Sequence, residues 1–149
     1  MKYSSVVFCL ILSMFSLVFL SCDNDNEKKD EIGILTSKAW KRGMVDKNPS
    51  TNPSYWGSKT LYYGALNCEQ DDSFIFSSDG SLVINHGGFL CEEDKNTEEK
   101  GTFSYDKTSN KLTINGLEYN VLEITDVQVE YYSDIPSATG YSYLTYMLQ

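Results

Sequence analysis

The hydrophobic positions of the chain form two different patterns. Residues 6–20 are almost all apolar, and only Ser13 and Ser16 interrupt the run. From Ile34 onward, short apolar or alternating runs recur between clusters of Gly, Asn, Asp and Ser, without a sustained helical i, i+3, i+4 pattern. This second pattern predicts β-strands that follow one another along the chain. The expected strands are residues 39–46, 60–66, 72–76, 82–85, 100–106, 111–114, 117–124, 127–132 and 141–148.

Two local features indicate how these strands connect and bend. Asn115 and Gly116 tolerate the positive φ angles of a type I′ turn, so the flanking strands should form a tight hairpin. Between Val121 and Leu122 the apolar residues change parity, which predicts a β-bulge. Such bends allow a sheet to close, and closure removes edges that promote aggregation. We therefore expect an all-β fold, a small up-and-down antiparallel β-barrel of about eight strands.

All three prolines lie in two segments with little periodicity, residues 47–58 and 133–140. Both segments are predicted to be long loops, and the first is expected to fold over a mouth of the barrel. Loops of this length often carry the functional residues of a β-scaffold.

The apolar run near the N-terminus is typical of a secretory signal peptide. Lys2 precedes the run, and the small residue Ser21 and then Cys22 follow it. A retained transmembrane helix is the alternative, but an apolar run over residues 6–20 is short for a bilayer that needs ~20 residues. Residues 23–27 are too polar to extend the run.

The junction Phe19-Leu20-Ser21-Cys22 resembles a bacterial lipobox, with Phe19 where Leu is usual. The resemblance implies a signal peptide over residues 1–21, a lipid on Cys22, a polar tether over residues 22–33 and a domain over residues 34–149. The acyl chains would then attach the protein to a membrane. The acidic residues behind Cys22 resemble an export signal of Gram-negative surface lipoproteins, although a plain hydrophilic spacer explains them equally. We expect a lipid-anchored protein of the outer membrane, on the cell surface.

The charge of the chain excludes one class of partner. There are 12 Lys and Arg residues against 21 Asp and Glu residues, which gives a formal net charge of −9. A chain this acidic, with no basic run, lacks the cationic surface that nucleic acids require. It would also be repelled by anionic lipid, so we expect membrane attachment only through the lipid on Cys22.

Cys68 and Cys91 remain after processing, because Cys9 leaves with the signal peptide and Cys22 takes the lipid. Two cysteines in an exported, oxidising compartment most often pair. A bridge between them would contribute about 3 to 4 kcal/mol in the chain-entropy picture. Zinc is the alternative, but neither cysteine lies in a CxxC motif and His86 is the only histidine. The spacing alone does not decide whether the bridge forms.

A set of short motifs, in this order and spacing, resembles the lipocalin-like domain of bacterial lipoproteins over nearly all of residues 34–149. The motifs are Leu35 with Trp40, Cys68-Glu69-Gln70-Asp71-Asp72, Phe74-Ile75-Phe76, Asp79-Gly80, Cys91, Gly101-Thr102-Phe103, Leu112-Thr113-Ile114 and the strand at residues 119–124. The resemblance implies a small β-barrel behind a lipobox, an N-terminal Trp that plugs one end, and a cysteine pair able to form a disulfide. No activity is established for the family as a class.

Aromatic residues are the candidates for a binding site. Trp40 is expected to plug the end of the barrel, with its ring buried and its N–H bonded to one acceptor. Trp56, Tyr62 and Tyr63 lie near a predicted loop, where they could line a pocket or pack under the loop. The candidate ligand-binding residues are Trp56, Tyr62, Tyr63, Tyr119, Tyr131 and Tyr143.

Catalytic motifs are not evident. His86 lies in Asn85-His86-Gly87-Gly88 and is expected to be an exposed turn residue, and no G-x-S-x-G elbow accompanies it. Paired carboxylates occur at Asp71-Asp72, Glu92-Glu93-Asp94 and Glu98-Glu99, in polar contexts that give no sign of burial. A solvated acidic rim, with at most a weak Ca²⁺ site, explains them most simply. We therefore expect no enzyme, no cofactor and no specific metal site.

Two functions remain, with a third at low weight. The first is a binding module for a small apolar or amphipathic ligand, which predicts a cavity. The second is a structural or protein-interaction lipoprotein of a surface assembly, which predicts a packed interior and an exposed apolar patch. An enzyme would instead require His86 or a carboxylate pair to converge in a cleft, with one member buried.

Overall fold

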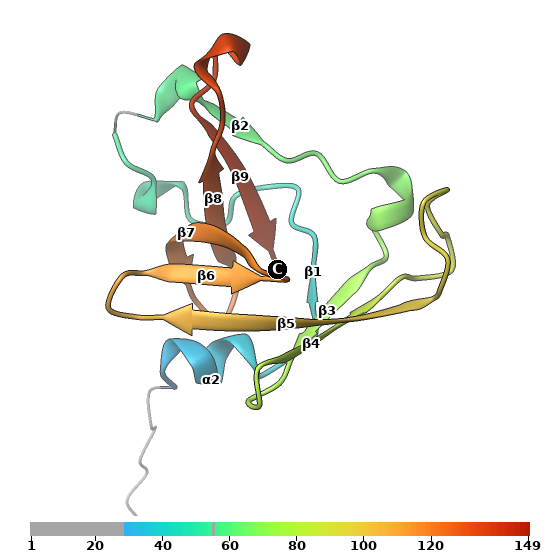
Figure 1. The fold of residues 1–149 in the computed structure, drawn as a ribbon. Coiled ribbons are helices and arrows are strands. Elements are labelled where there is room, and N and C mark those ends of the chain that lie inside the picture. The colour runs from blue at the N-terminus through green and yellow to red at the C-terminus, as the bar shows by residue number, and fades with distance from the viewer. Residues whose placement is uncertain (1–28, 55) are drawn as a thin grey trace, which may run out of the picture.

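The computed structural model describes residues 29–54 and 56–149, which form one curled sheet and one short helix (Figure 1). The predicted signal peptide, the lipidation site Cys22 and the first part of the tether lie outside the described residues. Within the described residues, no helix has the length and apolar character needed to cross a membrane.

The sheet has nine strands, in the order β1-β3-β4-β5-β6-β7-β8-β9-β2. The strands are β1 (Trp40–Lys41), β2 (Thr60–Tyr62), β3 (Ser73–Phe76), β4 (Ser81–Asn85), β5 (Glu98–Asp106), β6 (Lys111–Ile114), β7 (Leu117–Ile124), β8 (Val129–Asp134) and β9 (Tyr143–Leu148). The helices are α2 (Glu31–Leu35) and the 3₁₀ turns η2 (Pro49–Thr51), η3 (Gly57–Lys59), η4 (Asn67–Glu69) and η5 (Ser137–Thr139). The strands curl into a half-barrel, and from β3 to β9 each pairs antiparallel with the next.

β2 departs from the expected up-and-down antiparallel order, because it pairs parallel with β9. The segment between β1 and β2, residues 42–54 and 56–59, is called the crossing segment below. It reverses direction while it crosses the outer face of β7, β8 and β9. Lys47 N–H donates to the Gln128 side chain at 2.8 Å, and Trp56 stacks on Tyr143 at 5.4 Å. The chain therefore reaches the outer edge of β9 already running in the same direction as that strand. A prediction from local pattern could not place this long crossing.

The outer edge of β9 is shared by two segments. Tyr63 N–H donates to the Thr145 carbonyl at 2.8 Å, next to the pairing of β2. Toward the other end, Lys41 and Gln149 exchange two backbone hydrogen bonds of 2.8 and 2.9 Å, and Gly43 N–H donates to Met147 at 2.8 Å. A Cβ on Gly43 would lie 2.9 Å from the Cβ of Met147, which cannot move without its backbone, so the close approach needs glycine. These bonds join the first strand of the sheet to β9.

The local predictions hold best in the middle of the chain. β6 and β7 have the expected bounds, and Asn115 and Gly116 have φ angles of 50° and 81°, which confirms the hairpin turn. The β7–β8 register shifts between Val121 and Glu123, which confirms the bulge. β1 is much shorter than expected, because the chain leaves the sheet at Gly43 to cross its outer face.

α2 lies beneath β5 (Figure 1), and its residue Leu35 belongs to the buried core together with Trp40. Asp30 caps α2 by accepting from Gly33 N–H at 2.7 Å, so the helix spans the expected boundary between tether and domain. Trp40 is fully buried and its indole N–H donates to the Leu35 carbonyl at 2.8 Å, as the sequence predicts. The buried core is Leu35, Trp40, Phe74, Phe76, Leu82, Phe103, Leu112, Val121, Val129, Tyr131 and Leu148.

Candidate functional site

A disulfide joins two loops on one side of the sheet. Cys68 lies in η4, and Cys91 lies in the connection between β4 and β5. Their Cα atoms are 5.2 Å apart and their sulfur atoms are bonded. This confirms the predicted pairing and excludes the alternative in which these thiolates bind zinc. The bridge holds residues 63–72 against residues 86–97.

The disulfide forms part of the wall of a pocket of about 500 Å³, which we call the loop pocket. Its lining residues are Tyr63, Leu66, Cys68, Glu69, Asp72, Cys91, Glu92, Glu93 and Asp94. Five of these nine are Asp or Glu, and none of the nine is Lys or Arg. Tyr63 and Leu66 add aromatic and aliphatic surface. The loop pocket therefore combines apolar contact area with a negative potential.

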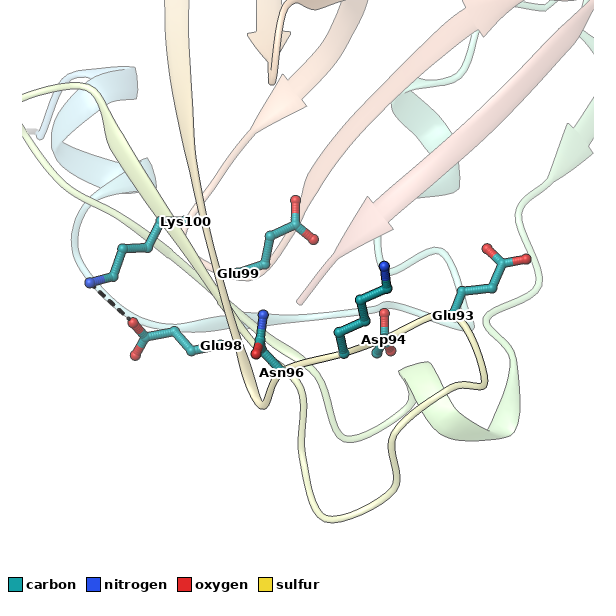
Figure 2. Close-up of a pocket in the computed structure, with 7 residues that line it drawn as sticks. Glu93, Asp94, Asn96, Glu98, Glu99 and Lys100 are labelled. Carbon is teal, nitrogen blue, oxygen red and sulfur yellow. Dashed lines mark ion pairs between the residues drawn. The ribbon is translucent and has the colours of Figure 1, made fainter.

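The negative surface continues around the connection between β4 and β5. Figure 2 shows a second hollow, of about 320 Å³, to which Glu93 and Asp94 also contribute. The start of β5 adds Glu98 and Glu99, and Lys100 pairs with Glu98 at 3.4 Å. The acidic residues of this connection thus form a rim, as the sequence predicts, but the rim encloses concave surface.

His86 is not the exposed turn residue that the sequence suggests. Its side chain is only 9% exposed, and its Nδ1 lies 3.1 Å from Asp72 Oδ2 and 3.6 Å from Asp94 Oδ2. Its Nε2 lies 3.9 Å from Glu99. The backbone N–H of His86 donates to the Thr97 carbonyl at 2.9 Å. The two ends of the β4–β5 connection are therefore paired just beyond β4. His86 therefore contacts both Asp72 and Asp94, two carboxylates that line the loop pocket, and holds them close to each other.

The two glycines after His86 also have a structural reason. Gly88 N–H donates to Asp71 Oδ2 at 2.7 Å, and a Cβ on Gly87 would lie 2.0 Å from the same oxygen. Any side chain at position 87 would push Asp71 away. The pair thus fixes the wall of the loop pocket that carries Asp72.

Tyr63 and Glu69 are held in place by each other. The Tyr63 hydroxyl donates to Glu69 at 2.8 Å, and Glu69 also accepts from Leu66 N–H at 2.8 Å. Burial, followed by the hydrogen bond and charge of Glu69, raises the pKa of Tyr63 to about 12. The phenol therefore stays protonated, and each described side-chain contact of His86 is with a carboxylate. This arrangement suits binding better than nucleophilic chemistry.

Of the six aromatic residues proposed from the sequence, Tyr63 alone lines the loop pocket. Tyr119 and Tyr131 pack edge to face at 5.1 Å inside the half-barrel, and Tyr131 stacks on Tyr146 at 5.3 Å. The Arg42 guanidinium lies 5.2 Å from the Tyr63 ring and donates to the Tyr131 hydroxyl at 3.3 Å. The tyrosine rings therefore pack on one another and around the Arg42 guanidinium.

The other proposed residues lie on the outer face. Trp56 is buried and contacts both Tyr143 and Tyr132, with ring centroids 5.4 and 5.2 Å apart. Tyr62 is 41% exposed on β2 and its hydroxyl accepts from Asn52 at 3.1 Å. Trp56 thus packs between its own loop and the rings of Tyr132 and Tyr143, which is one of the two alternatives that the sequence left open.

The sequence holds two signals for the loop pocket. The carboxylate groups Asp71-Asp72 and Glu92-Glu93-Asp94 each follow closely on Cys68 or Cys91. Because a disulfide brings its flanking residues together, the predicted bridge implied that both groups share one surface.

No family model matches the chain, and no curated protein or solved structure matches it. A function is therefore inferred from the geometry of the site.

Proposed function

We propose that the protein is a lipoprotein, anchored through Cys22, whose lipocalin-like domain binds a small amphipathic molecule in the loop pocket. The observation that carries the proposal is the pocket itself, about 500 Å³ in volume and walled by a disulfide. That volume lies within the ~300–1,000 Å³ typical of small-molecule sites.

The lining residues favour a ligand with a cationic group. Glu92 and Glu93 are exposed, and Glu69 and Asp72 are fixed by hydrogen bonds to Tyr63 and His86. A protonated amine would find charged acceptors here, whereas a carboxylate would be repelled. Leu66 and the ring of Tyr63 offer contact to an apolar tail. The ligand class is therefore a small organic cation with an apolar part.

Two observations support the proposed barrel and compartment. The backbone bonds of Lys41 and Gly43 to Gln149 and Met147 link the two ends of the antiparallel series, as a small closed barrel requires. A disulfide between Cys68 and Cys91 is consistent with an exported protein. We propose the outer-membrane, cell-surface location from the signal and lipobox pattern together with the acidic residues behind Cys22.

A specific observation also favours the second candidate, a protein-interaction lipoprotein. Apolar side chains are exposed beside the disulfide, with Leu66 60%, Phe89 71% and Leu90 40% exposed. Exposed apolar groups close together often mark a contact surface for a protein. The packed tyrosines of the interior are also what this candidate expects.

Native mass spectrometry of the full processed chain, purified in non-ionic detergent from its own cells, tests the two candidates. A non-covalent small mass that solvent extraction removes supports the loop pocket. A chain without such a mass that co-purifies with a stoichiometric protein supports the second candidate.

Defined probes test the charge preference. We expect 2-phenylethylamine to bind and 3-phenylpropionate, similar in size and opposite in charge, not to bind, as measured by titration calorimetry. The double variant Glu92→Gln/Glu93→Gln should weaken amine binding by about tenfold. The control Glu118→Gln/Asp126→Asn removes the same charge from residues outside the pocket lining and should bind like the wild type. Equal affinity for both probes would refute the preference.

A further inference from the structure

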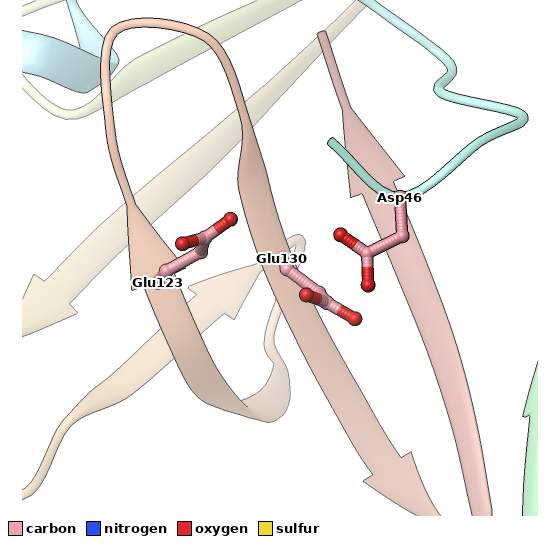
Figure 3. A group of neighbouring side chains, drawn as sticks. All are labelled: Asp46, Glu123 and Glu130. Atoms are coloured by element: carbon pink, nitrogen blue, oxygen red, sulfur yellow. The ribbon is translucent and has the colours of Figure 1, made fainter. Parts of the chain in front are cut away.

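A second group of carboxylates lies on the outer face of the sheet, apart from the loop pocket. Figure 3 shows Glu123 on β7 and Glu130 on β8, with Asp46 of the crossing segment facing them. One carboxylate oxygen from each residue lies within 4.8 Å of the others. Glu130 is 0% exposed and Glu123 is 8% exposed, while Asp46 is partly exposed.

The β-bulge creates this arrangement. Val121 faces the core, so regular alternation would also point Glu123 inward. The register shift after Val121 instead pairs Glu123 with Glu130, and both side chains face the crossing segment. Asn48 of that segment donates to Glu123 Oε2 at 2.8 Å. A bulge that re-aims a carboxylate in this way is typical of a functional position.

The three carboxyl groups are contacted by the neutral side-chain amides of Asn48, Asn52 and Gln128. The Gln128 amide nitrogen lies 2.8 Å from Glu123, 2.9 Å from Asp46 and 3.5 Å from Glu130. Its two hydrogens cannot satisfy three carboxylates. Among residues 29–54 and 56–149, no Lys or Arg forms an ion pair with any of the three. Buried carboxylates without a cation are costly.

Two buried oxygens at this place also lack a hydrogen-bond partner. One is Oε1 of the fully buried Glu130, and the other is Oδ1 of Asn52. Asn52 is attached to the group through its amide nitrogen, which donates to Asp46 Oδ2 at 2.8 Å. Buried acceptors are nearly always satisfied, so unpaired ones indicate a missing donor or cation.

We propose that Asp46, Glu123 and Glu130 bind a calcium ion, with the side-chain oxygen Oδ1 of Asn52 as a further ligand. All the ligand atoms are oxygens, which calcium prefers. Calcium accepts six to eight oxygen ligands in a flexible geometry, whereas Mg²⁺ demands near-octahedral geometry and usually keeps several waters, so a site built from several protein oxygens favours calcium. The partly exposed Asp46 gives the ion and its waters a path of entry.

The ion would join the crossing segment to the sheet. Asp46 and Asn52 belong to that segment, whereas Glu123 and Glu130 belong to β7 and β8. The Gln128 amide nitrogen contacts all three carboxyl groups. Calcium would replace these contacts with direct bonds to the crossing segment and to the two strands. The site does not depend on the ligand proposed for the loop pocket.

Titration of the full chain with calcium alone, after treatment with EDTA, tests the proposal. We expect one bound ion by calorimetry and a rise in Tm of several degrees in excess calcium. Magnesium at the same concentration should bind at least tenfold more weakly. Hydrogen exchange of amides 44–54 should slow when calcium is bound. No heat and no change in Tm at millimolar calcium would overturn the proposal.

Variants separate this site from the acidic rim. Asp46→Asn, which keeps the size of the side chain, should lower calcium affinity at least tenfold, and Glu130→Gln should abolish binding. Circular dichroism checks that both variants fold. Glu92→Gln/Glu93→Gln serves as the control, because it removes two charges from the loop pocket and should keep the affinity. Loss of binding in that control, with none in Asp46→Asn, would show that calcium binds only the rim.

Discussion

The β8–β9 hairpin is buried on both faces, but in two different ways. Its inner face carries Val129, Tyr131 and Leu148, which pack against the core of the half-barrel. Its outer face carries Glu130, Thr145 and Met147, which are equally buried under the crossing segment. The curvature of the sheet covers the first face, and an irregular segment covers the second.

The difference shows what each kind of covering requires. Apolar side chains on a curled sheet find partners on other strands, so no specific polar contact is needed. An irregular segment must be held at one position, and here hydrogen bonds of the Asn48 and Gln128 amides join it to the sheet. Buried polar networks of this kind specify one arrangement, at the cost of groups that must all be satisfied.

The largest effect should come from truncating neighbouring residues on opposite faces. Leu148→Ala should lower the free energy of unfolding by about 4 kcal/mol, because it leaves a cavity in the core. Met147→Ala should cost about 2 kcal/mol, because the crossing segment can settle into the space. Urea denaturation measures both. Equal costs would show that the outer face is packed as tightly as the inner.

The next effect concerns pH. Burial, then the charges of Asp46 and Glu123, raise the pKa of Glu130 from 4.5 to about 8. The folded state therefore holds a proton that the unfolded state releases, so stability should fall as the pH rises from about 4.5 to 8. We expect a loss of roughly 3 kcal/mol in EDTA, measured by urea denaturation at pH 5 and pH 8.

Glu130→Gln provides the comparison for this prediction. The amide does not titrate, so the variant should lose less stability over the same pH range and be the more stable protein at pH 8. Parallel pH profiles for the two proteins would mean that Glu130 is ionised in the folded state.

A smaller effect is expected inside the half-barrel. Tyr131→Phe removes the hydroxyl that accepts from Arg42 at 3.3 Å and leaves the ring stacking in place. The loss should be about 1 kcal/mol in thermal or urea unfolding. A loss above about 3 kcal/mol would mean that the inner face also depends on a polar network.

The smallest effect should be that of Trp56→Phe on the outer face. The indole N–H of Trp56 is buried and has no hydrogen-bond partner among the described residues, so its removal forfeits no bond. The remaining ring can keep contacts with Tyr132 and Tyr143, and we expect a change below about 1 kcal/mol. Urea denaturation checks this, and a cost as large as that of Met147→Ala would contradict it.

The parts of the fold that could be predicted are those fixed by near neighbours. The turn at Asn115 and Gly116 follows from backbone sterics, and the bulge after Val121 follows from the parity of one strand. The Cys68–Cys91 bridge follows from the predicted oxidising compartment and from the two cysteines that remain after processing. The burial of Trp40 follows from the size and apolar character of its ring.

The rest depends on contacts between distant segments. α2 has only five residues, too few for a helical period to show. The burial of His86 depends on Asp72 and Asp94, on two other parts of the chain. Asp46 meets Glu123 because the crossing segment turns over the outer face, and no sequence pattern links the two. The acidic residues were therefore visible in the sequence, but which of them are buried was not.

The shared edge of β9 has a consequence for the order of folding. The backbone bonds of Lys41 and Gly43 are with Gln149 and Met147, so these residues near the start of the sheet find their partners only when residues 147–149 are available. Pairings this distant in sequence form slowly, because much of the intervening chain must be arranged first. During that interval the early strands would lack their final partners. If the chain is exported from its N-terminus, as we propose, these bonds would form only after residues 147–149 have crossed the membrane.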